Sequence, residues 1–344
     1  MTAPMLLALA LGDPNGIGPE IAVKVAAGGA QARVVLFGDA HVIRWYAERC
    51  AQQAAVRAVR IDQLPAAEPG VIDFVDVRAL DVAAFAPGVV SPAAGTATLA
   101  YVGAALDAAR AGHVDAVIAC PHSETAINAS GVRFAGYPGF VAQRMDLPAD
   151  DVYLLLVGGG LRIVHVTLHE GIFSALARID QRHVENAARA AVAALRRMGI
   201  ERPTVGIMGI NPHAGEGGLF GREDIDITEP AARALREEGI DVVGPLGGDL
   251  LLADSNVDVF VAMYHDQGHI PVKLRAGRHS AAMSVGAGVV FSSVGHGSGF
   301  DIAGQLRADP APLLGAIRLV TTGTMAAPGE QSHQAAHQAA HQPR

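Results

Sequence analysis

The sequence is poor in cysteine, in aromatic residues and in positive charge, and each shortage excludes a class of protein. Only two of the 344 residues are cysteine, Cys50 and Cys120, so a disulfide framework and a metal site made of thiolates alone are both excluded. Cys120 ends an apolar run and is expected to be a buried thiol. The formal net charge is -8 and no basic run interleaves with aromatic residues, which argues against a nucleic-acid partner.

Long apolar runs are also missing, so no segment is expected to cross a bilayer. The first residues lack the basic region of a signal peptide and lead directly into a loop rich in glycine and proline, which predicts a first strand. A soluble, cytoplasmic protein without a membrane partner is therefore expected. Residues 328–344 repeat His-Gln-Ala-Ala. They are expected to form a disordered tail, although histidines four residues apart could also chelate a metal on a helix.

The hydrophobic content is mainly aliphatic, because 50% of the residues are hydrophobic and only 5% are aromatic. Short apolar runs alternate along the chain with stretches of helical spacing, as in the helix expected from Gly95 to Gly112 and the strand expected from Val114 to Cys120. This alternation predicts an α/β protein with a largely parallel sheet flanked by helices. No linker separates two domains, so residues 1–327 are expected to form one unit. A pairing of the first and last thirds around a middle insertion stays open.

An early loop, Gly12–Glu20, opens the first expected helix. Its glycines would let a ligand approach the backbone closely. It matches neither a Walker loop nor the dinucleotide fingerprint. Taken alone, the loop is a weak functional signal.

Polar residues follow the strand expected from Val257 to Met263, and they include His265, Asp266 and Lys273. An open α/β sheet places its ligands at the carboxyl edge of its strands, so these residues are candidates for a site. The plain alternative is a polar loop after a strand.

Two more histidines follow strands in the same way: His169 after Leu161–Thr167, and His213 after Thr204–Ile210. Together with His265 they would supply three neutral imidazoles, which suit a catalytic zinc or a similar divalent ion. Spacing in the sequence cannot show that the three converge. Four other histidines are rivals for the same task, and the one inside a strand is expected to be buried structure; they are His122, His165, His269 and His296.

Several motifs in matching order resemble those of the 4-phosphohydroxy-L-threonine dehydrogenases, the PdxA family of metal-dependent enzymes. The resemblance covers nearly the whole chain and rests on Gly12–Glu20, Asn211–Glu216, Tyr264–Gly268 and Asp301–Gly304. It implies the isocitrate/isopropylmalate dehydrogenase type of fold, with two interleaved subdomains and the active site in the cleft between them. It also implies a homodimer in which a histidine of the neighbouring subunit completes each site.

The resemblance assigns roles to individual residues as well. It implies that His169, His213 and His265 are the metal ligands. The loop that ends at Gly304 looks like the cofactor loop of the wider superfamily, which implies that NAD is bound by Gly295, His296, Gly297, Ser298 and Asp301. NAD rather than NADP rests on the resemblance alone.

The chain departs from the phosphothreonine enzymes where those enzymes would hold a phosphate. It has Gly136-Tyr137-Pro138-Gly139 in place of Gly-His-Thr-Glu, Glu124 in place of a lysine, and Ala282 and Phe291 in place of an asparagine and an arginine. A phosphate dianion needs donors and positive charge, so a phosphorylated substrate is not expected.

The altered stretches are similar to those of a second branch, the terephthalate cis-dihydrodiol dehydrogenases. The similar runs are Asp115–His122, Glu124–Ile127, Gly136–Pro138, Leu161–Glu170 and Ser292–Ser298. This resemblance implies oxidation of 1,2-dihydroxy-3,5-cyclohexadiene-1,4-dicarboxylate with NAD, and release of CO2 to give protocatechuate.

The residue types fit that chemistry, with Lys273 as proton donor or electrostatic stabiliser, Asp266 as orienter or base, and Asp249 as a further candidate near the metal. The candidates for binding the substrate carboxylates are His122, Tyr137, Arg133 and Arg162. Zinc leads among the metals, with cobalt, nickel and manganese as alternatives. Two other functions stay open: oxidation of a phosphorylated four-carbon hydroxy acid, and metal or ligand binding without catalysis.

Overall fold

The protein is built around a single twelve-stranded sheet. The computed structural model describes residues 5–28, 32–254, 256–277 and 280–323. The strand order in the sheet is β3-β4-β2-β1-β5-β12-β11-β6-β7-β10-β8-β9. In chain order the strands are β1 (Leu6–Ala10), β2 (Arg33–Gly38), β3 (Ala55–Ala58), β4 (Val71–Asp76), β5 (Ala116–Ala119), β6 (Tyr153–Gly158), β7 (Leu161–His165), β8 (Val205–Met208), β9 (Val242–Leu246), β10 (Val259–Ala262), β11 (Ala281–Val285) and β12 (Val290–Val294).

Most neighbouring strands run parallel. The exceptions are the pairs of β11 with β12, β11 with β6, and β6 with β7, which are antiparallel. The predicted α/β class with a largely parallel sheet is therefore confirmed. No helix in the described part of the chain is long and apolar enough to cross a membrane.

Helices pack on both faces of the sheet. They are α1 (Gly18–Gly28), α2 (Ala40–Cys50), α3 (Pro92–Arg110), α4 (Glu124–Ala129), α5 (Tyr137–Arg144), α6 (Ile172–Arg178), α7 (Gln181–Arg197), α8 (Glu229–Glu237), α9 (Gly248–Leu251), α10 (His265–Ala276) and α11 (Ala311–Thr322). Short 3-10 segments lie at Ile61–Gln63, Val82–Ala84, Ala149–Asp151 and Pro212–Gly218, and a π-turn lies at Asp224–Thr228. Successive residues of a strand face opposite sides. Accordingly Leu155 of β6 belongs to the larger core, whereas Leu156 belongs to a smaller core with Val272 and Ala276 of α10.

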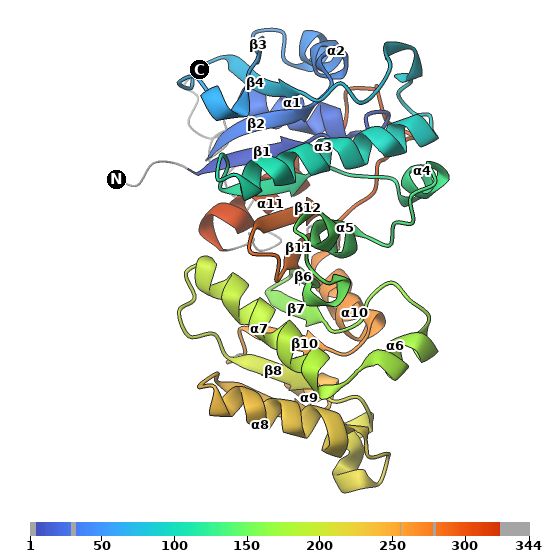
Figure 1. Ribbon diagram of the computed structural model, residues 1–344, viewed down its shortest axis with the longest axis vertical. Coiled ribbons are helices and arrows are strands. Elements are labelled where there is room, and N and C mark those ends of the chain that lie inside the picture. The colour runs from blue at the N-terminus through green and yellow to red at the C-terminus, as the bar shows by residue number, and fades with distance from the viewer. Residues whose placement is uncertain (1–4, 29–31, 255, 278–279, 324–344) are drawn as a thin grey trace, which may run out of the picture.

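The last third of the chain joins the two ends of the sheet. Strands β11 and β12 lie between β5, from the first third, and β6, from the middle of the chain. Figure 1 shows β1 to β4 at one end of the long axis, and β8 with α8 at the other. A pairing of the first and last thirds, left open by the sequence, is thus present in the β5–β12 pair. The division into two subdomains stays a prediction, and the predicted tail, 328–344, lies outside the described residues.

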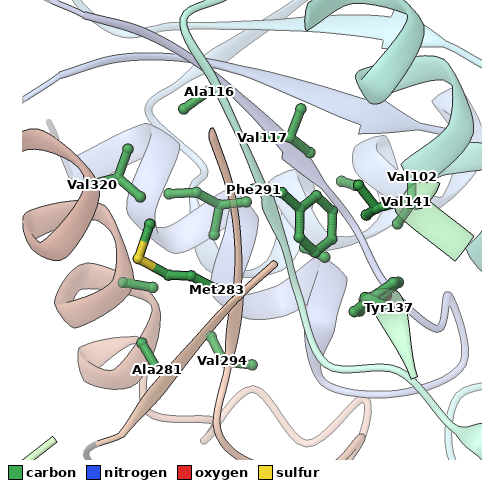
Figure 2. Close-up of a cluster of buried hydrophobic side chains, with 14 of the residues drawn as sticks. Val102, Ala116, Val117, Tyr137, Val141, Ala281, Met283, Phe291, Val294 and Val320 are labelled. Atoms are coloured by element: carbon green, nitrogen blue, oxygen red, sulfur yellow. The ribbon is translucent and has the colours of Figure 1, made fainter. Parts of the chain in front are cut away.

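A hydrophobic cluster surrounds this junction. Phe291 of β12 is 1% exposed and lies opposite Val117 of β5. Its ring centroid is 5.0 Å from that of Tyr137, at the start of α5. Figure 2 shows both rings together with Val102 of α3 and Val320 of α11. Burying a phenylalanine of this kind contributes about 2 kcal/mol to stability, so the cluster joins the helices on both faces to the sheet.

Local sequence signals hold at several helix starts. Asp180 caps α7, because its carboxylate accepts a hydrogen bond of 2.8 Å from the His183 amide. Thr228 directly precedes α8, but its side chain makes no capping hydrogen bond. The Thr228 hydroxyl bonds to Asp224 instead, because a π-turn from Asp224 to Thr228 precedes α8 and occupies the hydroxyl. Cys120 is fully buried, as predicted.

Helix α10 replaces the polar loop that was the plain alternative after β10. It begins at His265 and continues through Pro271, although a proline inside a helix removes one backbone hydrogen bond. Three polar side chains spaced four residues apart, those of His265, His269 and Lys273, therefore lie along one face of a helix.

Candidate active site

The strands that precede the three candidate metal ligands lie side by side in the sheet. Strand β10 is flanked by β7 and β8, and both pairs are parallel. The residues that follow these strands therefore leave the same edge of the sheet, which brings the loops of His169, His265 and His213 to a common side. The sequence could not show this convergence of the loops, and the ligand set itself stays a prediction.

His169 and His265 are close to each other. Their ring centroids are 5.4 Å apart. The Nδ1 atom of His169 is 2.8 Å from the carbonyl oxygen of Ala135, and the Nδ1 atom of His265 is 2.7 Å from a carboxylate oxygen of Asp266. A carbonyl oxygen or a carboxylate only accepts hydrogen bonds, so each Nδ1 carries a proton, and in the neutral form of each ring Nε2 keeps its lone pair. Metal-binding histidines commonly have this second contact.

His213 lies in a turn of unusual backbone. Residues 213–217 all have positive φ, including 54° at His213 and 46° at Glu216. Left-handed backbone at residues other than glycine costs about 1 kcal/mol or more each, and such strain collects at functional sites. Nδ1 of His213 is 3.0 Å from the Glu216 carboxylate, so in the neutral form of this ring, too, Nδ1 carries the proton and Nε2 keeps a lone pair. Asp249 lies beside the turn, since a Cβ on Gly247 would be 2.8 Å from its carboxylate and 3.7 Å from the His213 Cα.

The donor chemistry of the three histidines fits a divalent ion, because an oxygen bonded to each Nδ1 orients the ring and leaves Nε2 for a metal. The geometry brings together only part of the set. Within the described ranges, no group of three or more His, Cys, Asp or Glu side chains is close enough to hold a metal ion. His169 and His265 are in ring contact, whereas His213 lies with Glu216 and Asp249 on the next loop. The predicted triad therefore stays a prediction.

A cavity of about 350 Å³, called here the central cavity, lies beside His169. Helix α10, strands β6, β11 and β12, and the start of α5 form its walls. The candidate residues that line it are His122, Tyr137, His169, Lys273, Gly295, His296 and Gly297. A neighbouring cavity of about 460 Å³ is lined by His169, His265 and Asp266. His169 lines both cavities, whereas Lys273 lines only the central cavity and His265 and Asp266 line only its neighbour.

Lys273 is half-buried in the wall of the central cavity. Its ammonium group donates to the Ser280 hydroxyl at 2.8 Å and to the Gly295 carbonyl at 3.1 Å. Burial lowers the pKa of Lys273 below its usual value. The charge is therefore held in a fixed place, where a developing oxyanion could use it.

The candidate cofactor loop is tied to two other parts of the site. Gly295 accepts from Lys273, and a Cβ at this position would lie 2.4 Å from the carbonyl oxygen of Ser280, so only glycine fits. The Ser298 carbonyl accepts from the Ile17 amide at 2.8 Å, which joins the loop to Gly12–Glu20. The Gly12–Glu20 loop thus supports the candidate cofactor loop through this backbone hydrogen bond. Ser298 is buried and Asp301 is exposed, and neither lines the central cavity.

Aromatic side chains form another part of the lining of the central cavity, with His122 and Tyr137 among them. His122 packs against Tyr137, with ring centroids 4.5 Å apart, and against Phe134. Burial, and secondarily nearby His169, lowers the pKa of His122 to about 4, so this imidazole is neutral. The buried Tyr137 hydroxyl has no hydrogen-bond partner among the described residues. A buried polar group without a partner is costly, and a ligand is one way to satisfy it.

Neither of the two arginines that the sequence suggests for carboxylate binding lines the central cavity. Arg162 lies near the start of β7, at the end opposite His169, and its guanidinium donates to the Asp258 carbonyl at 3.4 Å. Arg133 lines an adjoining pocket, which shares Leu154 and His169 with the central cavity. Both roles stay predictions, and the placement of Arg162 does not support its role.

Comparison with known proteins decides the family. Residues 30–320 match the family described as pyridoxal phosphate biosynthetic protein PdxA. The chain belongs to the PdxA family. A 1,2-dihydroxy-3,5-cyclohexadiene-1,4-dicarboxylate dehydrogenase of Comamonas sp. is 46% identical over 91% of the chain and 96% of its own length. A D-threonate 4-phosphate dehydrogenase of Cupriavidus necator is 36% identical over 91% of the chain and 95% of its own length.

Solved structures give the same relationship. A terephthalate 1,2-cis-dihydrodiol dehydrogenase of Burkholderia xenovorans LB400 is 73% identical, with a TM-score of 0.73 over 94% of the chain and 99% of its own. A 4-hydroxythreonine-4-phosphate dehydrogenase of Klebsiella pneumoniae is 32% identical, with a TM-score of 0.82 over 94% of the chain and 99% of its own. These relatives are dehydrogenases, which establishes this PdxA-family chain as an oxidoreductase.

In this PdxA-family chain, sequence reasoning passed over one pair of residues at the site. His165 is 1% exposed in β7, as expected for buried structure, yet its Nε2 lies 3.0 Å from Nδ1 of His269 in the cavity wall. The two residues are 104 positions apart, so no local pattern could have linked them.

Proposed function

We propose that the protein is a metal- and NAD-dependent dehydrogenase that oxidises and decarboxylates a cis-dihydrodiol carboxylate. The substrate would be terephthalate dihydrodiol, 1,2-dihydroxy-3,5-cyclohexadiene-1,4-dicarboxylate, and the products protocatechuate, CO2 and NADH. Relatives of that name are 46% and 73% identical to the chain.

The lining of the central cavity is the observation that favours this substrate over a phosphorylated one. Among the described lining residues, Lys273 is the only lysine or arginine. Ala282 lines the cavity with an apolar methyl group, and Phe291 is turned into the hydrophobic core. A phosphate group concentrates two negative charges on one set of oxygens and would meet only the Lys273 cation there. The dihydrodiol instead carries single charges on carboxylates at opposite ends of its ring, and apolar and aromatic walls suit the ring between them.

The reaction needs three things from the protein: a position for the diol, a path for hydride, and stabilisation of negative charge. A bound nicotinamide would take up hydride from the carbon that bears the secondary hydroxyl, and the hydroxyl proton would pass to a base, for which Asp266 is the candidate. The ketone so formed is β to a carboxylate, so the carbon–carbon bond breaks, CO2 leaves, and the electron pair forms an enolate. Gain of an aromatic ring drives the second step. Lys273 lies in the cavity wall, where its cation would stabilise the enolate oxygen or protonate it.

The metal-binding role is proposed for His169, His213 and His265. A divalent ion held there would lower the pKa of the bound hydroxyl. Asp266 would keep the His265 ring oriented through its bond to Nδ1. Asp249 is proposed as a further acidic group near His213. Zinc is the leading metal, with cobalt, nickel and manganese as alternatives.

The nicotinamide cofactor is proposed to lie along Gly295–Ser298, with Asp301 further along the same loop. This loop borders the central cavity at Gly295, His296 and Gly297. The Gly295 carbonyl of this loop also accepts a hydrogen bond from the Lys273 ammonium. A cofactor bound along the loop would therefore lie beside the reacting oxygen. We propose NAD rather than NADP.

A homodimer with shared sites is also proposed. Large apolar side chains are exposed on the helices around the site, including Phe173 of α6 at 88% and Leu274 of α10 at 82%. Exposed apolar patches of this kind mark interaction surfaces. A second copy of the chain would cover them and bring a histidine to each site. The site itself takes a small molecule, and the protein is proposed to act in the cytoplasm.

Product analysis tests the proposal. The purified protein, loaded with zinc, is incubated with NAD and the dihydrodiol of terephthalate carrying a ¹³C label in the C1 carboxylate. Protocatechuate, NADH and labelled CO2 in equal amounts are expected. NADH without CO2, or no product at all with this diol, would contradict the proposal.

A second enzymatic function has support from the relatives that act on phosphorylated four-carbon compounds, which are 36% and 37% identical. Turnover of 4-phosphohydroxy-L-threonine or D-threonate 4-phosphate, without turnover of the diol, would favour it. Metal binding without NAD reduction across all these compounds would favour a non-catalytic relative.

A further inference from the structure

We infer that His269 presents an unprotonated Nε2 to the central cavity, where it accepts a hydrogen bond from a substrate hydroxyl, and that His165 is the positioning residue that fixes this state. The inference deepens the proposed function and rests on it for the identity of the hydroxyl compound. The state of the ring itself follows from the structure alone.

The hydrogen bonds form a chain with one direction. Nδ1 of His165 lies 3.2 Å from the carbonyl oxygen of Leu154. A carbonyl oxygen cannot donate, so Nδ1 of His165 carries a proton. His165 is 1% exposed and has no acidic partner among its described contacts, so its ring is neutral and its Nε2 has no proton. Nε2 of His165 is therefore an acceptor.

The acceptor state of His165 decides the state of His269. Nδ1 of His269 lies 3.0 Å from Nε2 of His165 and must donate to it. The proton of a neutral His269 is thereby held on Nδ1, and its Nε2 keeps a lone pair. His269 lines the central cavity, so the lone pair is available to a ligand.

The backbone is shaped to allow this contact. A Cβ built on Gly268 would lie 2.4 Å from Nε2 of His165 and 2.8 Å from a methyl carbon of Ile163. Any larger residue at Gly268 would displace the His165 ring from His269. The close approach of helix α10 to strand β7 therefore requires glycine at this position.

The position of His269 suits a hydroxyl that is being oxidised. On α10 it lies between His265, one turn before, and Lys273, one turn after. Its ring stacks on that of His265, with centroids 3.8 Å apart and planes 12° apart. An acceptor between the proposed metal ligand and the proposed oxyanion stabiliser would orient the hydroxyl of a diol and disfavour substrates without that donor.

Neutron diffraction of crystals of the full-length protein exchanged into D2O tests the state of the rings directly. Deuterium on Nδ1 of both His165 and His269, with none on Nε2 of His269, is the expected result. Deuterium on Nε2 of His269 would overturn the inference. This result does not depend on which compound is turned over, so it is separable from failure of the proposed function.

Kinetics of matched variants test the role. His269→Leu is expected to lower kcat/KM for the dihydrodiol about 10- to 100-fold, because one hydrogen bond to the reacting hydroxyl is lost, whereas His269→Gln keeps an oxygen acceptor and is expected to restore most of the loss. His165→Leu is expected to lower kcat/KM about 10-fold, chiefly through kcat, and His165→Gln to recover part of it. Equal activity of His269→Leu and wild type would overturn the role.

A control variant separates this effect from simple loss of stability. His41 packs against Phe85 in the first third of the chain, away from the cavity. His41→Leu makes the same change of side chain and is expected to leave kcat and KM within about 2-fold of wild type. A drop in the control as large as that of His165→Leu would show that the His165 effect is structural, and would overturn the positioning role.

Discussion

Replacing Lys273 by methionine is the perturbation whose effect the structure defines most fully. Methionine keeps the unbranched length of the side chain and removes only the charge and the donors. The lost interactions are those to the Ser280 hydroxyl at 2.8 Å and the Gly295 carbonyl at 3.1 Å, together with the cation offered to the cavity. Both acceptors can turn to water or to substrate, so the fold is expected to survive.

The magnitude follows from where the charge sits. A preorganised donor aimed at a developing oxyanion contributes about 3–4 kcal/mol, which corresponds to about 100- to 1000-fold in kcat. Lys273 is half-buried and fixed by two acceptors, so little reorganisation accompanies the reaction. Lys273→Met is therefore expected to lower kcat about 100- to 1000-fold, with a smaller change in KM.

The assay follows NADH formation from the dihydrodiol at saturating NAD, over a range of pH. Burial lowers the pKa of Lys273, so wild-type activity is expected to fall on the alkaline side at a pH below the ordinary range of lysine, and the variant is expected to lack this fall. Arg275→Met removes an exposed cation from the same helix and is the matched control. A Lys273→Met enzyme that keeps kcat within about 3-fold of the control would refute the role.

Three further predictions concern stability, measured by urea unfolding. Asp180→Ala removes the cap that accepts from the His183 amide, and is expected to lower the free energy of unfolding by about 1 kcal/mol; no change would refute the cap. Burial raises the pKa of Asp13 from 3.8 to about 6, so its contribution to stability is present below pH 4 and is lost as the pH rises through 6. The wild type should therefore lose up to about 3 kcal/mol relative to Asp13→Asn between pH 4 and 7, and parallel curves for the two proteins would contradict this. Phe291→Arg places an unpaired guanidinium at a site that is 1% exposed and breaks the contact with Tyr137, so a loss of about 3–5 kcal/mol is expected; an equally stable variant that binds phosphate would contradict the proposed loss of phosphate recognition.

The class of fold could be predicted from the sequence because its signals are local. Apolar runs of strand length mark β1, β5 and β8, and a carboxylate at Asp180 marks the start of α7. The pairing of β5 with β12 could not be predicted, because the two strands are separated by the whole middle of the chain. Nothing in the spacing of residues specifies that β11 and β12 join two halves of one sheet.

From the sequence, the site could be predicted only one strand at a time, as the polar residues that follow each strand. Each histidine that follows a strand could be found from the sequence, and the order β7-β10-β8 then places their loops on one side. The left-handed turn at His213 could not be predicted, because residues such as Ala214 and Glu216 rarely adopt positive φ. The contact between His165 and His269 depends on tertiary packing, which a single sequence does not encode in any local pattern.

The most direct test of the central claim is the ratio of two specificity constants. The kcat/KM for terephthalate cis-dihydrodiol and that for 4-phosphohydroxy-L-threonine would be measured with NAD on the same zinc-loaded preparation. A cavity with one lysine and no arginine among its described lining residues predicts at least about 1000-fold preference for the diol, since a phosphate dianion would lose several kcal/mol of charge-assisted hydrogen bonding. A preference for the phosphorylated compound would contradict the account.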